Sequence, residues 1–423
     1  MTMGLLYRKG MMMNSKLEHM LENKWMRGAL PAILLHVCIG TVYCWSLLKG
    51  EIAAAIGCQT SQIEMAFSLA IFFLGMSAAF GGQYVEHNVK RSSCISMVAF
   101  VCGLLGSILA IRLQSVPLLF LFYGCVMGIG LGIGYLSPVK TLMLWFTKHK
   151  GLATGIAISG FGLAKVLFSP FITWCNAAHG VTTTLLLMAC ISIVLMGIAV
   201  LLIRKPADWV EPMSSLSFKE LWSIIGRPDY MKIWFIFYLN ITCGLAIIAF
   251  EKDLALASCI VAVGMLSSLT ALFNTLGRFG YSTVSDVMTR KAWIYVIIFA
   301  SSFAVSVANG LTSVFLPLLV IIGMCIINAG YGGGFSTLPT LLQSRFGMGK
   351  ISTIHGMTLS AWAMAGLSGN QLSNLILNHW GGTFNDLFFV IAALYGLSCV
   401  LSVSLLNMKK NETNETIIYK MKS

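Results

Sequence analysis

Three cationic side chains lie inside long apolar stretches of this 423-residue chain: Lys140, Lys165 and Arg278. If those stretches cross a bilayer, a charge near its centre costs at least ~2.5–3.5 kcal/mol, so such a residue usually marks a binding path. Guanidinium and ammonium groups bind carboxylates and phosphates through charge-assisted hydrogen bonds. The chemistry that these residues favour is therefore the binding of a small anion.

Arg278 is the strongest of the three candidates. It lies eight residues before Asp286, or about 12 Å along a helix at 1.5 Å per residue. That depth strains a snorkelling side chain, and a purely structural ion pair is the alternative. Lys165 lies 15 residues into its stretch, and it either joins the site or snorkels to the outer surface. Lys140 lies near the inner end of its stretch, and we expect it to snorkel inward.

The acidic side chains fall in the tails, in loops or at the ends of the apolar stretches. No carboxylate is therefore available inside a stretch to carry a coupling proton or to bind sodium. His36 and His355 lie within stretches, and we interpret them as packed, hydrogen-bonded side chains rather than as a proton relay. The simplest process is anion exchange or facilitated passage. Proton cotransport stays open if the substrate or His36 carries the proton.

Aromatic and amide side chains complete the candidate site. Tyrosine hydroxyls donate to carboxylates and aromatic rings exclude water, although ordinary core packing is the alternative for each ring. Asn274 lies one turn from Arg278, where it can orient the guanidinium. The predicted substrate-binding residues are Arg278, Lys165, Asn274, Tyr43, Trp45, Tyr135, Tyr331 and Trp362.

The elements that must hold these residues are membrane helices. The chain is 57% hydrophobic and only 10% charged, too few charges to cover a soluble protein. Apolar stretches longer than about 18 residues are typical of membrane spans. Twelve such segments lie near 28–48, 64–85, 93–112, 117–145, 151–175, 181–203, 230–250, 257–282, 292–310, 313–343, 351–378 and 384–407.

The formal net charge of +13 reflects membrane topology, because the Lys and Arg residues gather in the tails and in alternate loops. We therefore expect no nucleic-acid partner. The even number of segments and the basic tails place both termini in the cytoplasm, and the protein in the cell (inner) membrane as a multi-pass monomer in the lipid bilayer.

Other classes of protein are disfavoured. The twelve cysteines are scattered without a CxxC pair, so we expect neither disulfides nor a metal site. No nucleophile–base arrangement or phosphate loop is present, so we expect no cofactor and no enzyme. A sensor or receptor with a transporter fold is the remaining alternative.

Two glycine-rich motifs recur in the same register. "GIGLGIGYLSP" (128–138) and "GYGGGFSTLP" (330–339) place glycines at 130, 132 and 134 and again at 330, 332 and 334. The same offset of 200 places "GQYVEHNVKR" (82–91) opposite "STVSDVMTRK" (282–291). With a slip of one residue, "TGIAISGFG" (154–162) faces "HGMTLSAWA" (355–363). We infer a tandem duplication of a six-span unit, whose halves share one orientation in the membrane.

The duplication predicts the organisation of the chain. The expected parts are a cytoplasmic tail (1–27), a first six-helix bundle (28–203), a cytoplasmic linker (204–229), a second bundle (230–407) and a cytoplasmic tail (408–423). Within the linker, "FKELWSI" has the pattern of a short amphipathic interfacial helix.

"GQYVEHNVKR" resembles the major facilitator signature G-x-x-x-D-R-x-G-R-R, which lies between spans two and three; His87 and Val89 depart from it. "GTVYCWS" (40–46), "WFTKHKGLATGIAISGFG" (145–162) and "GGGFSTLPTLL" (332–342) resemble the oxalate/formate antiporter family within that superfamily. The residues that match the two copies of the signature, and that we assign to gating, are Gly82, Glu86, Lys90, Arg91, Asp286, Arg290 and Lys291.

The resemblance implies an all-α membrane protein with twelve transmembrane helices in two parallel-related six-helix bundles. It also implies alternating access and small carboxylate anions as substrates. The family's oxalate site uses an arginine in span eight, here Arg278, and a lysine in span eleven, where this chain has Trp362. One fixed cation suits a monoanion and two suit a dianion, so we expect formate or pyruvate rather than oxalate. Lys165 is an alternative source of the second cation, because the resemblance makes spans five and eight neighbours.

The resemblance also predicts a latch at the cytoplasmic end. It places Glu86 near the start of span eleven (352–355) and Asp286 near the start of span five (151–154). Helix N-termini have free N–H groups and a partial positive charge, which attract carboxylates. The alternative is that both acids only anchor the basic turns beside them.

Overall fold

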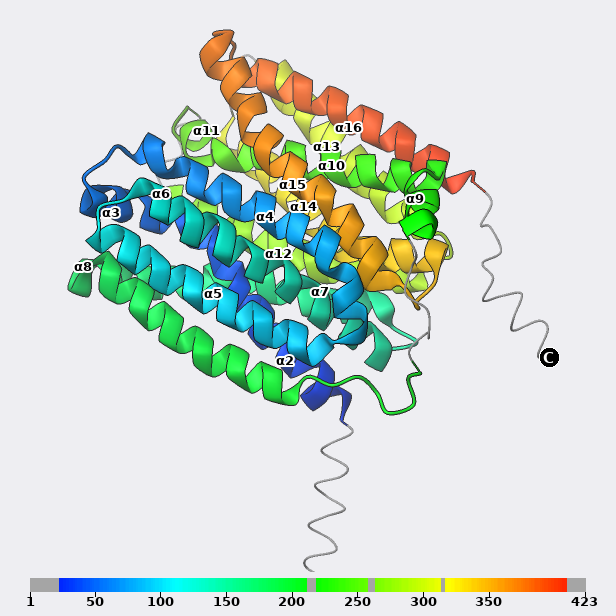
Figure 1. The fold of residues 1–423 in the computed structure, drawn as a ribbon. Coiled ribbons are helices and arrows are strands. Elements are labelled where there is room, and N and C mark those ends of the chain that lie inside the picture. Colours follow the sequence, from blue (N-terminus) through cyan, green and yellow to red (C-terminus); the bar gives the residue numbers. More distant parts are fainter. Residues whose placement is uncertain (1–22, 211–217, 258–262, 313–315, 409–423) are drawn as a thin grey trace, which may run out of the picture.

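The structure is a computed structural model that describes residues 23–210, 218–257, 263–312 and 316–408. The described chain is helical throughout, and its helices run side by side in one bundle (Figure 1). The helices of the first half are η1 (Trp25–Ala29), α2 (Leu30–Ile39), η2 (Gly40–Cys44), α3 (Trp45–Ile56), α4 (Thr60–His87), α5 (Val89–Arg112), α6 (Val116–Leu119), η3 (Phe120–Val126), α7 (Met127–Trp145) and α8 (Lys150–Leu202).

The second half repeats this plan after a short helix. Its helices are α9 (Phe218–Ile225), α10 (Pro228–Ala249), α11 (Glu251–Ala257), α12 (Val263–Val287), α13 (Ala292–Leu311), α14 (Pro317–Phe346), α15 (Ile351–Asn374), η4 (Leu375–His379) and α16 (Phe384–Leu406). The helix α9 covers the "FKELWSI" motif of the predicted linker, whereas residues 211–217 lie outside the described part.

Within the described residues, nine helical runs are long and apolar enough to cross a membrane. One of them is the 53-residue α8, whose backbone leaves the helical region at Gly180 (φ 78°). A side chain at that φ is strained, so glycine permits the turn between the predicted segments 151–175 and 181–203. The helices α12 and α15 match the two remaining predicted segments, and they are less apolar because they carry many Ser, Thr, Gly and Asn residues.

The bounds of most helices agree with the predicted segments to within a few residues. Two segments differ by more. The helical run that covers the segment predicted at 28–48 continues to Ile56. For the segment predicted at 257–282, α12 runs from Val263 to Val287, and residues 258–262 lie outside the described part. Hydropathy alone misplaced this segment, because the polar residues near the end of α12 are buried against α8 rather than exposed in a loop.

The most extensive contacts between the halves are those of α4 along α15 and of α8 along α12. Figure 1 shows α4 in blue beside α15 in orange. Glycines allow the close approach, since a Cβ on Gly82 would lie 2.6 Å from the Ser352 carbonyl oxygen and one on Gly162 would lie 2.7 Å from Thr275 Oγ1. Small residues are the usual means by which membrane helices pack closely.

The recurring glycines make matching contacts in the two halves. A Cβ on Gly132 of α7 would clash with Leu74 and lie 2.9 Å from Ala78 N of α4. A Cβ on Gly332 of α14 would clash with Asn274 and lie 3.0 Å from Arg278 Cγ of α12. These partners are themselves 200 residues apart. The structure thus supports the inferred duplication, with Arg278 at the place where the first half has Ala78.

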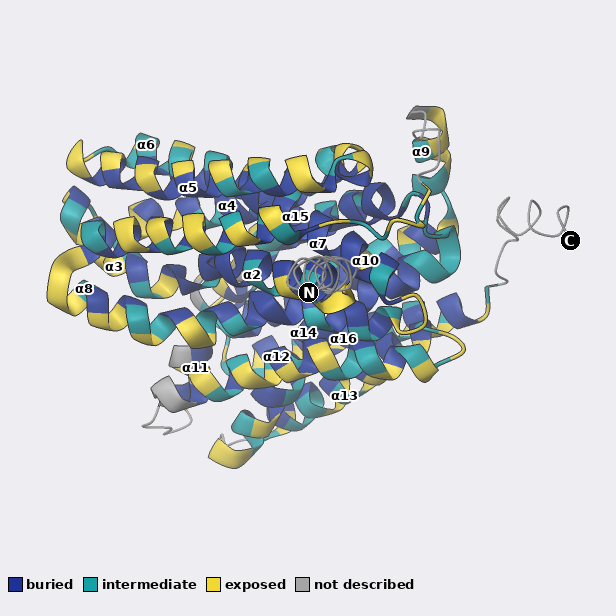
Figure 2. Cartoon of the chain, turned by 90° about the horizontal axis from the view of Figure 1, so that it is seen from below, coloured by how far each residue is buried: buried dark blue, intermediate teal, exposed yellow. Residues whose placement is uncertain are grey.

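The outer faces of the peripheral helices are apolar. Exposed residues lie along the outward side of helices such as α8 and α13 (Figure 2), and they include Leu186, Val194, Ile297 and Phe303. Exposed apolar surface of this extent is unusual for a soluble monomer and suits contact with lipid.

Candidate functional site

Arg278 is fully buried near the middle of the bundle, on α12. Its Nε donates to Asn274 Oδ1 at 2.9 Å, and its Nη1 donates to the Ile158 carbonyl oxygen at 3.4 Å. Its Nη2 has no hydrogen-bond partner among the described residues. Within that same part of the chain, no carboxylate forms an ion pair with the guanidinium. Asn274 holds the group in one orientation and leaves its charge uncompensated.

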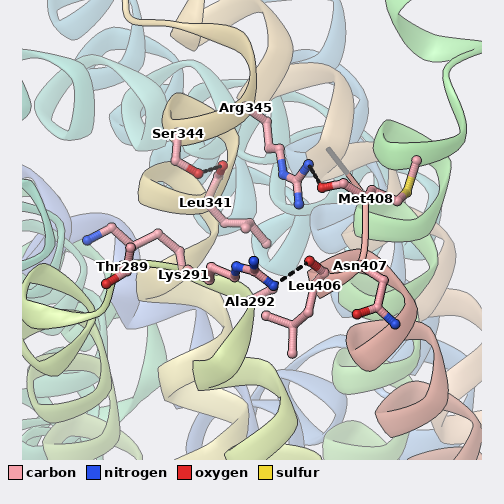
Figure 3. A pocket seen from close by; sticks show the side chains of 10 residues that line it. Thr289, Lys291, Ala292, Leu341, Ser344, Arg345, Leu406, Asn407 and Met408 are labelled. Atoms are coloured by element: carbon pink, nitrogen blue, oxygen red, sulfur yellow. Dashed lines mark hydrogen bonds between the residues drawn. The ribbon is translucent and has the colours of Figure 1, made fainter. Parts of the chain in front are cut away.

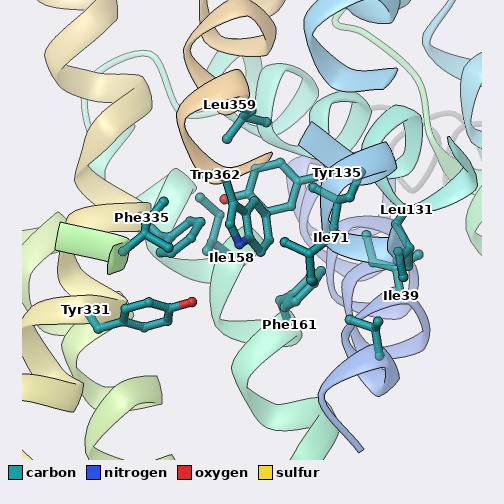
Figure 4. Close-up of a cluster of buried hydrophobic side chains, with 14 of the residues drawn as sticks. Ile39, Ile71, Leu131, Tyr135, Ile158, Phe161, Tyr331, Phe335, Leu359 and Trp362 are labelled. Atoms are coloured by element: carbon teal, nitrogen blue, oxygen red, sulfur yellow. The ribbon is translucent and has the colours of Figure 1, made fainter. Parts of the chain in front are cut away.

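Trp362 packs against three other aromatic rings (Figure 4), and two of these contact Arg278. The Trp362 ring centroid lies 5.6 Å from that of Tyr135, 5.9 Å from that of Phe161 and 4.5 Å from that of Phe335. The guanidinium carbon lies 5.3 Å from the centre of the Phe335 ring and 5.8 Å from that of Phe161. These rings hold the cation by cation–π contact and keep water away from it. We call these four rings the ring box.

The ring box also contains unused donors. The Tyr135 hydroxyl and Trp362 Nε1 are buried without a hydrogen-bond partner among the described residues, as is Arg278 Nη2. Leaving a buried donor without a hydrogen-bond acceptor costs about 1–3 kcal/mol of folding free energy. Such donors in a native protein therefore call for an explanation, and a bound ligand that accepts their hydrogen bonds is one. A carboxylate accepts several hydrogen bonds and carries the matching charge.

Two tyrosines close one end of the ring box and join the halves. Tyr43 OH lies 3.3 Å from Tyr331 OH. The Tyr43 ring contacts Phe161 with centroids 5.1 Å apart, and the Tyr331 ring contacts Phe335 at the same separation. Both hydroxyls lie within electrostatic reach of Arg278.

Two of the predicted substrate-binding residues lie elsewhere. Trp45 is buried against Tyr123, with ring centroids 4.6 Å apart, so it packs inside the first half. Lys165 is half-buried one helical turn beyond Phe161 on α8 and lies near Cys44. No contact of Lys165 with Arg278 is seen among the described residues.

The expectation that Lys140 snorkels was wrong. Lys140 is buried, with 1% of its surface exposed. Its ammonium forms an ion pair with the Glu86 carboxylate and donates to the Glu86 carbonyl oxygen at 3.0 Å. A buried partner of opposite charge removes the reason to reach for water. The sequence hid this partner because it lies 54 residues away, on α4.

Phe161 and Phe335 were missed by the sequence analysis. The internal repeat could have identified both residues. An offset of 200 pairs Phe335 with the predicted Tyr135, and an offset of 201 pairs Phe161 with the predicted Trp362. The ring box is therefore built from two pairs of equivalent positions, one residue from each half.

Two histidines flank Tyr135 from opposite halves. The His36 ring on α2 lies 5.3 Å from the Tyr135 ring, and the His355 ring on α15 lies 5.9 Å from it. His36 Nδ1 donates to the Ala32 carbonyl oxygen at 3.1 Å, which fixes its tautomer. The Nε2 atoms of both rings have no hydrogen-bond partner in the described part of the chain.

The two acids assigned to gating contact the expected helix starts. Glu86 Oε1 accepts a hydrogen bond from Thr353 N at 3.0 Å. Asp286 accepts two, from Gly151 N at 2.6 Å and from Leu152 N at 2.9 Å. These contacts tie α4 to α15 and α12 to α8, so the halves are latched at this end. We call these two contacts the latch.

The basic residues of the same turns behave differently in the two halves. Lys90 and Arg91 are exposed. Arg290 Nη1 donates to the Leu406 carbonyl oxygen at 3.1 Å, and Lys291 Nζ donates to the Ser285 carbonyl oxygen. Partial burial lowers the pKa of Lys291, and the nearby Asp286 opposes that shift. The turn of the second half is therefore fixed against its own bundle.

Comparisons with known proteins agree with this architecture. The family model described as Major Facilitator Superfamily matches residues 32–370. The oxalate:formate antiporter of Oxalobacter formigenes is 24% identical over 387 residues, which cover 88% of this chain and 89% of that protein. The uncharacterized MFS-type transporter YhjX of Escherichia coli K12 is 24% identical over 79% of this chain and 84% of its own.

A solved structure shows the same fold. The Major Facilitator Superfamily transporter FucP in its outward conformation superposes with a TM-score of 0.70 at 12% identity, over 89% of this chain and 98% of that one. These findings confirm the predicted fold class and the resemblance to the oxalate/formate antiporter family. They also confirm the prediction that the chain is a transporter and not an enzyme. The chain belongs to the Major Facilitator Superfamily of membrane transporters.

Proposed function

We propose that this protein is a secondary transporter that exchanges small monocarboxylates by alternating access. The observation that carries the proposal is the buried cation Arg278 at the ring box, which has no carboxylate partner among the described residues and has unused donors on Tyr135 and Trp362 beside it. A carboxylate satisfies the guanidinium and these donors together.

The charge count supports a monoanion. A monocarboxylate neutralises Arg278, whereas a dianion would leave a net negative charge among aromatic rings, where desolvation is costly. Trp362 stands where the resemblance expects a second cation, and it is fully buried in the ring box. Formate and pyruvate fit this description better than oxalate does. The name of the Oxalobacter relative includes both oxalate and formate, so it supports a small carboxylate without deciding between the two.

The same charge supports exchange over free return of the empty carrier. With no anion bound, the occluded state must bury an unpaired guanidinium, which costs several kcal/mol. A bound carboxylate removes that cost, so the carrier crosses the occluded state faster when loaded. Each return step then favours a second anion, which makes the overall process an exchange.

Proton-coupled symport is the second candidate. Its supporting observation is the pair His36 and His355, whose unpartnered Nε2 atoms flank Tyr135 at the ring box. A proton bound there would travel with the anion. A dependence of uptake into anion-free vesicles on an imposed pH gradient would favour this candidate over exchange.

The residues around the latch suggest which end of the protein faces the cytoplasm. Its acids lie beside basic turns, which favour the cytoplasmic side of a membrane. We propose that the latched end faces the cytoplasm of the cell membrane, with both termini on that side, and that the parts of the chain divide at residues 28, 204, 230 and 408. On this proposal the structure is closed toward the cytoplasm.

Exchange is tested with purified protein in proteoliposomes. Vesicles are loaded with unlabelled formate, pyruvate or oxalate, or left without anion, and uptake of each labelled acid is measured. We expect uptake of a labelled monocarboxylate that is at least tenfold faster into vesicles loaded with the same acid than into empty ones. Equal rates in loaded and empty vesicles would contradict exchange, and no carboxylate uptake in any vesicle would favour a sensor or receptor.

A further inference from the structure

A polar cavity lies in the second half, next to the turn that follows Asp286 (Figure 3). Its volume is about 450 Å³. It lies between the turn that joins α12 to α13 and the final turns of α14 and α16. The lining residues are Thr289, Arg290, Lys291, Ala292, Leu341, Ser344, Arg345, Leu406, Asn407 and Met408. We call it the basic pocket.

Three cations of the basic pocket are held in place by the backbone. Arg345 Nη1 donates to the Met408 carbonyl oxygen at 3.2 Å, and its Nη2 donates to the Leu405 carbonyl oxygen at 2.7 Å. Arg290 and Lys291 donate to other backbone carbonyl oxygens. Carbonyl oxygens orient these groups without cancelling their full charges. Each of the three cations keeps further N–H donors available to a ligand.

Among the described residues, no carboxylate lines the basic pocket. The acids that act on its cations are Asp286, near Lys291, and Asp229, near Arg345. Each already has closer partners. Asp286 accepts from Gly151 and Leu152, and Asp229 forms an ion pair with Arg227 at 2.7 Å. Three positive charges therefore converge on one cavity with little compensation.

The first half shows that the helix end does not require the third cation. An offset of 200 pairs Arg345 with Trp145, whose Nε1 donates to the Arg204 carbonyl oxygen at 2.8 Å. An uncharged indole thus makes the same kind of contact with the chain after α8. The positive charge of Arg345 is therefore not needed for this contact at the helix end, and its presence points to an anionic ligand.

We propose that the basic pocket binds a phosphate group, from an anionic phospholipid headgroup or from a free phosphate compound. Arginine forks match phosphate oxygens, and a phosphate offers enough oxygens to reach three cations at once. Basic pockets between membrane helices on the cytoplasmic side suit anionic headgroups. This site differs from the ring box in its chemistry, because it is polar, open and triply charged.

The test measures binding rather than transport, so it does not depend on the proposed substrate. Protein in nanodiscs of phosphatidylcholine is titrated with phosphatidylglycerol, and retained lipid is measured by native mass spectrometry. In a second arm, inorganic phosphate competes with that lipid. Competition at millimolar phosphate assigns the site to free phosphate compounds, and its absence assigns the site to lipid. Retention of phosphatidylcholine equal to that of phosphatidylglycerol, without an effect of phosphate, would overturn the proposal.

Variants make the test specific to the basic pocket. The double change Arg290→Gln with Lys291→Gln should weaken binding by about 30-fold, since each surface cation contributes about fivefold. The matched control is Lys90→Gln with Arg91→Gln, at the equivalent turn, which should weaken binding less than twofold. Equal losses in both pairs would reduce the effect to general surface charge and overturn the proposal.

A third variant avoids the helix ends. Thr289 is exposed and lines the basic pocket, and Thr289→Glu adds a carboxylate without removing a contact to α16. It should weaken retention of phosphatidylglycerol at least fivefold. If the arginine variants do not fold, this variant decides the question, and unchanged retention in it would overturn the proposal.

Discussion

At the scale of single residues, charge and its local partner determine what this transporter can bind. Arg278 and Lys140 are both fully buried. Lys140 has the Glu86 carboxylate beside it and is neutralised within its own half. Arg278 donates to the neutral Asn274 and to a carbonyl oxygen, and among the described residues no carboxylate pairs with it. Of these two buried cations, the one that lacks a carboxylate is the one available to an anionic substrate.

Trp362→Lys tests the charge count of the ring box. A second cation beside Arg278 is repelled unless a dianion occupies the site, so preference should shift toward oxalate. A charge-assisted hydrogen bond contributes about 1.5–3 kcal/mol, which corresponds to roughly a 10- to 100-fold change in the oxalate-to-formate ratio. Competition between the two acids during exchange measures this ratio.

The control for that change is Trp362→Phe, which keeps an aromatic ring and adds no charge. Its ratio should stay within about threefold of the wild type. If the lysine variant folds and its ratio is also unchanged, Trp362 does not face the substrate.

At the scale of helices, the close packing of neighbouring helices sets the position of the Arg278 side chain. The helix α14 meets α12 at Gly332, directly beside Asn274 and Arg278. The helix starts of α15 and α8 receive the latch acids of α4 and α12. The same elements that carry the site therefore also carry the contacts that close one end of the protein.

Gly332→Ala should displace α12 and misplace the guanidinium. Overpacking of a tight interface costs about 1–3 kcal/mol, so we expect a lower unfolding temperature together with at least tenfold slower exchange. Gly280→Ala is the matched control on α12, because nothing lies within 4 Å of its added methyl group. Wild-type stability and exchange in Gly332→Ala would show that the approach of α14 does not position Arg278.

The latch predicts how the closed end responds to loss of its acids. Each contact between a carboxylate and a helix start contributes about 0.3–2 kcal/mol. Glu86→Gln and Asp286→Asn should therefore both increase labelling from the cytoplasmic side of a cysteine placed at Ser159, in a background without reactive native cysteines. Labelling rates of a membrane-impermeant thiol reagent measure the change.

Glu64→Gln is the control for the latch, because Glu64 lies on α4 as well but pairs with Lys49 near the opposite end. It should leave labelling unchanged. Unaltered labelling in both latch variants would show that Glu86 and Asp286 only anchor their own turns and do not hold the halves together.

At the scale of the whole molecule, the repeat explains how much the sequence could predict. Hydropathy located the helices because a bilayer demands long apolar runs. The repeat register located the equivalent turns. Neither signal sets the rotation of a helix that is apolar on all sides, so the sequence missed Phe161 and Phe335 and assigned Trp45 to the site. The pairing of Lys140 with Glu86 was missed for the same reason, because it depends on which side of α7 faces α4.

The central claim is that Arg278 supplies the charge that a monocarboxylate must neutralise before the carrier can turn over. The most direct measurement is exchange of a labelled monocarboxylate by Arg278→Gln in proteoliposomes, compared with the wild type and with Arg112→Gln, which removes an exposed charge at the end of α5. We predict a loss of at least about tenfold in Arg278→Gln and wild-type exchange in Arg112→Gln. Exchange by folded Arg278→Gln at the wild-type rate and half-saturation concentration would contradict the account.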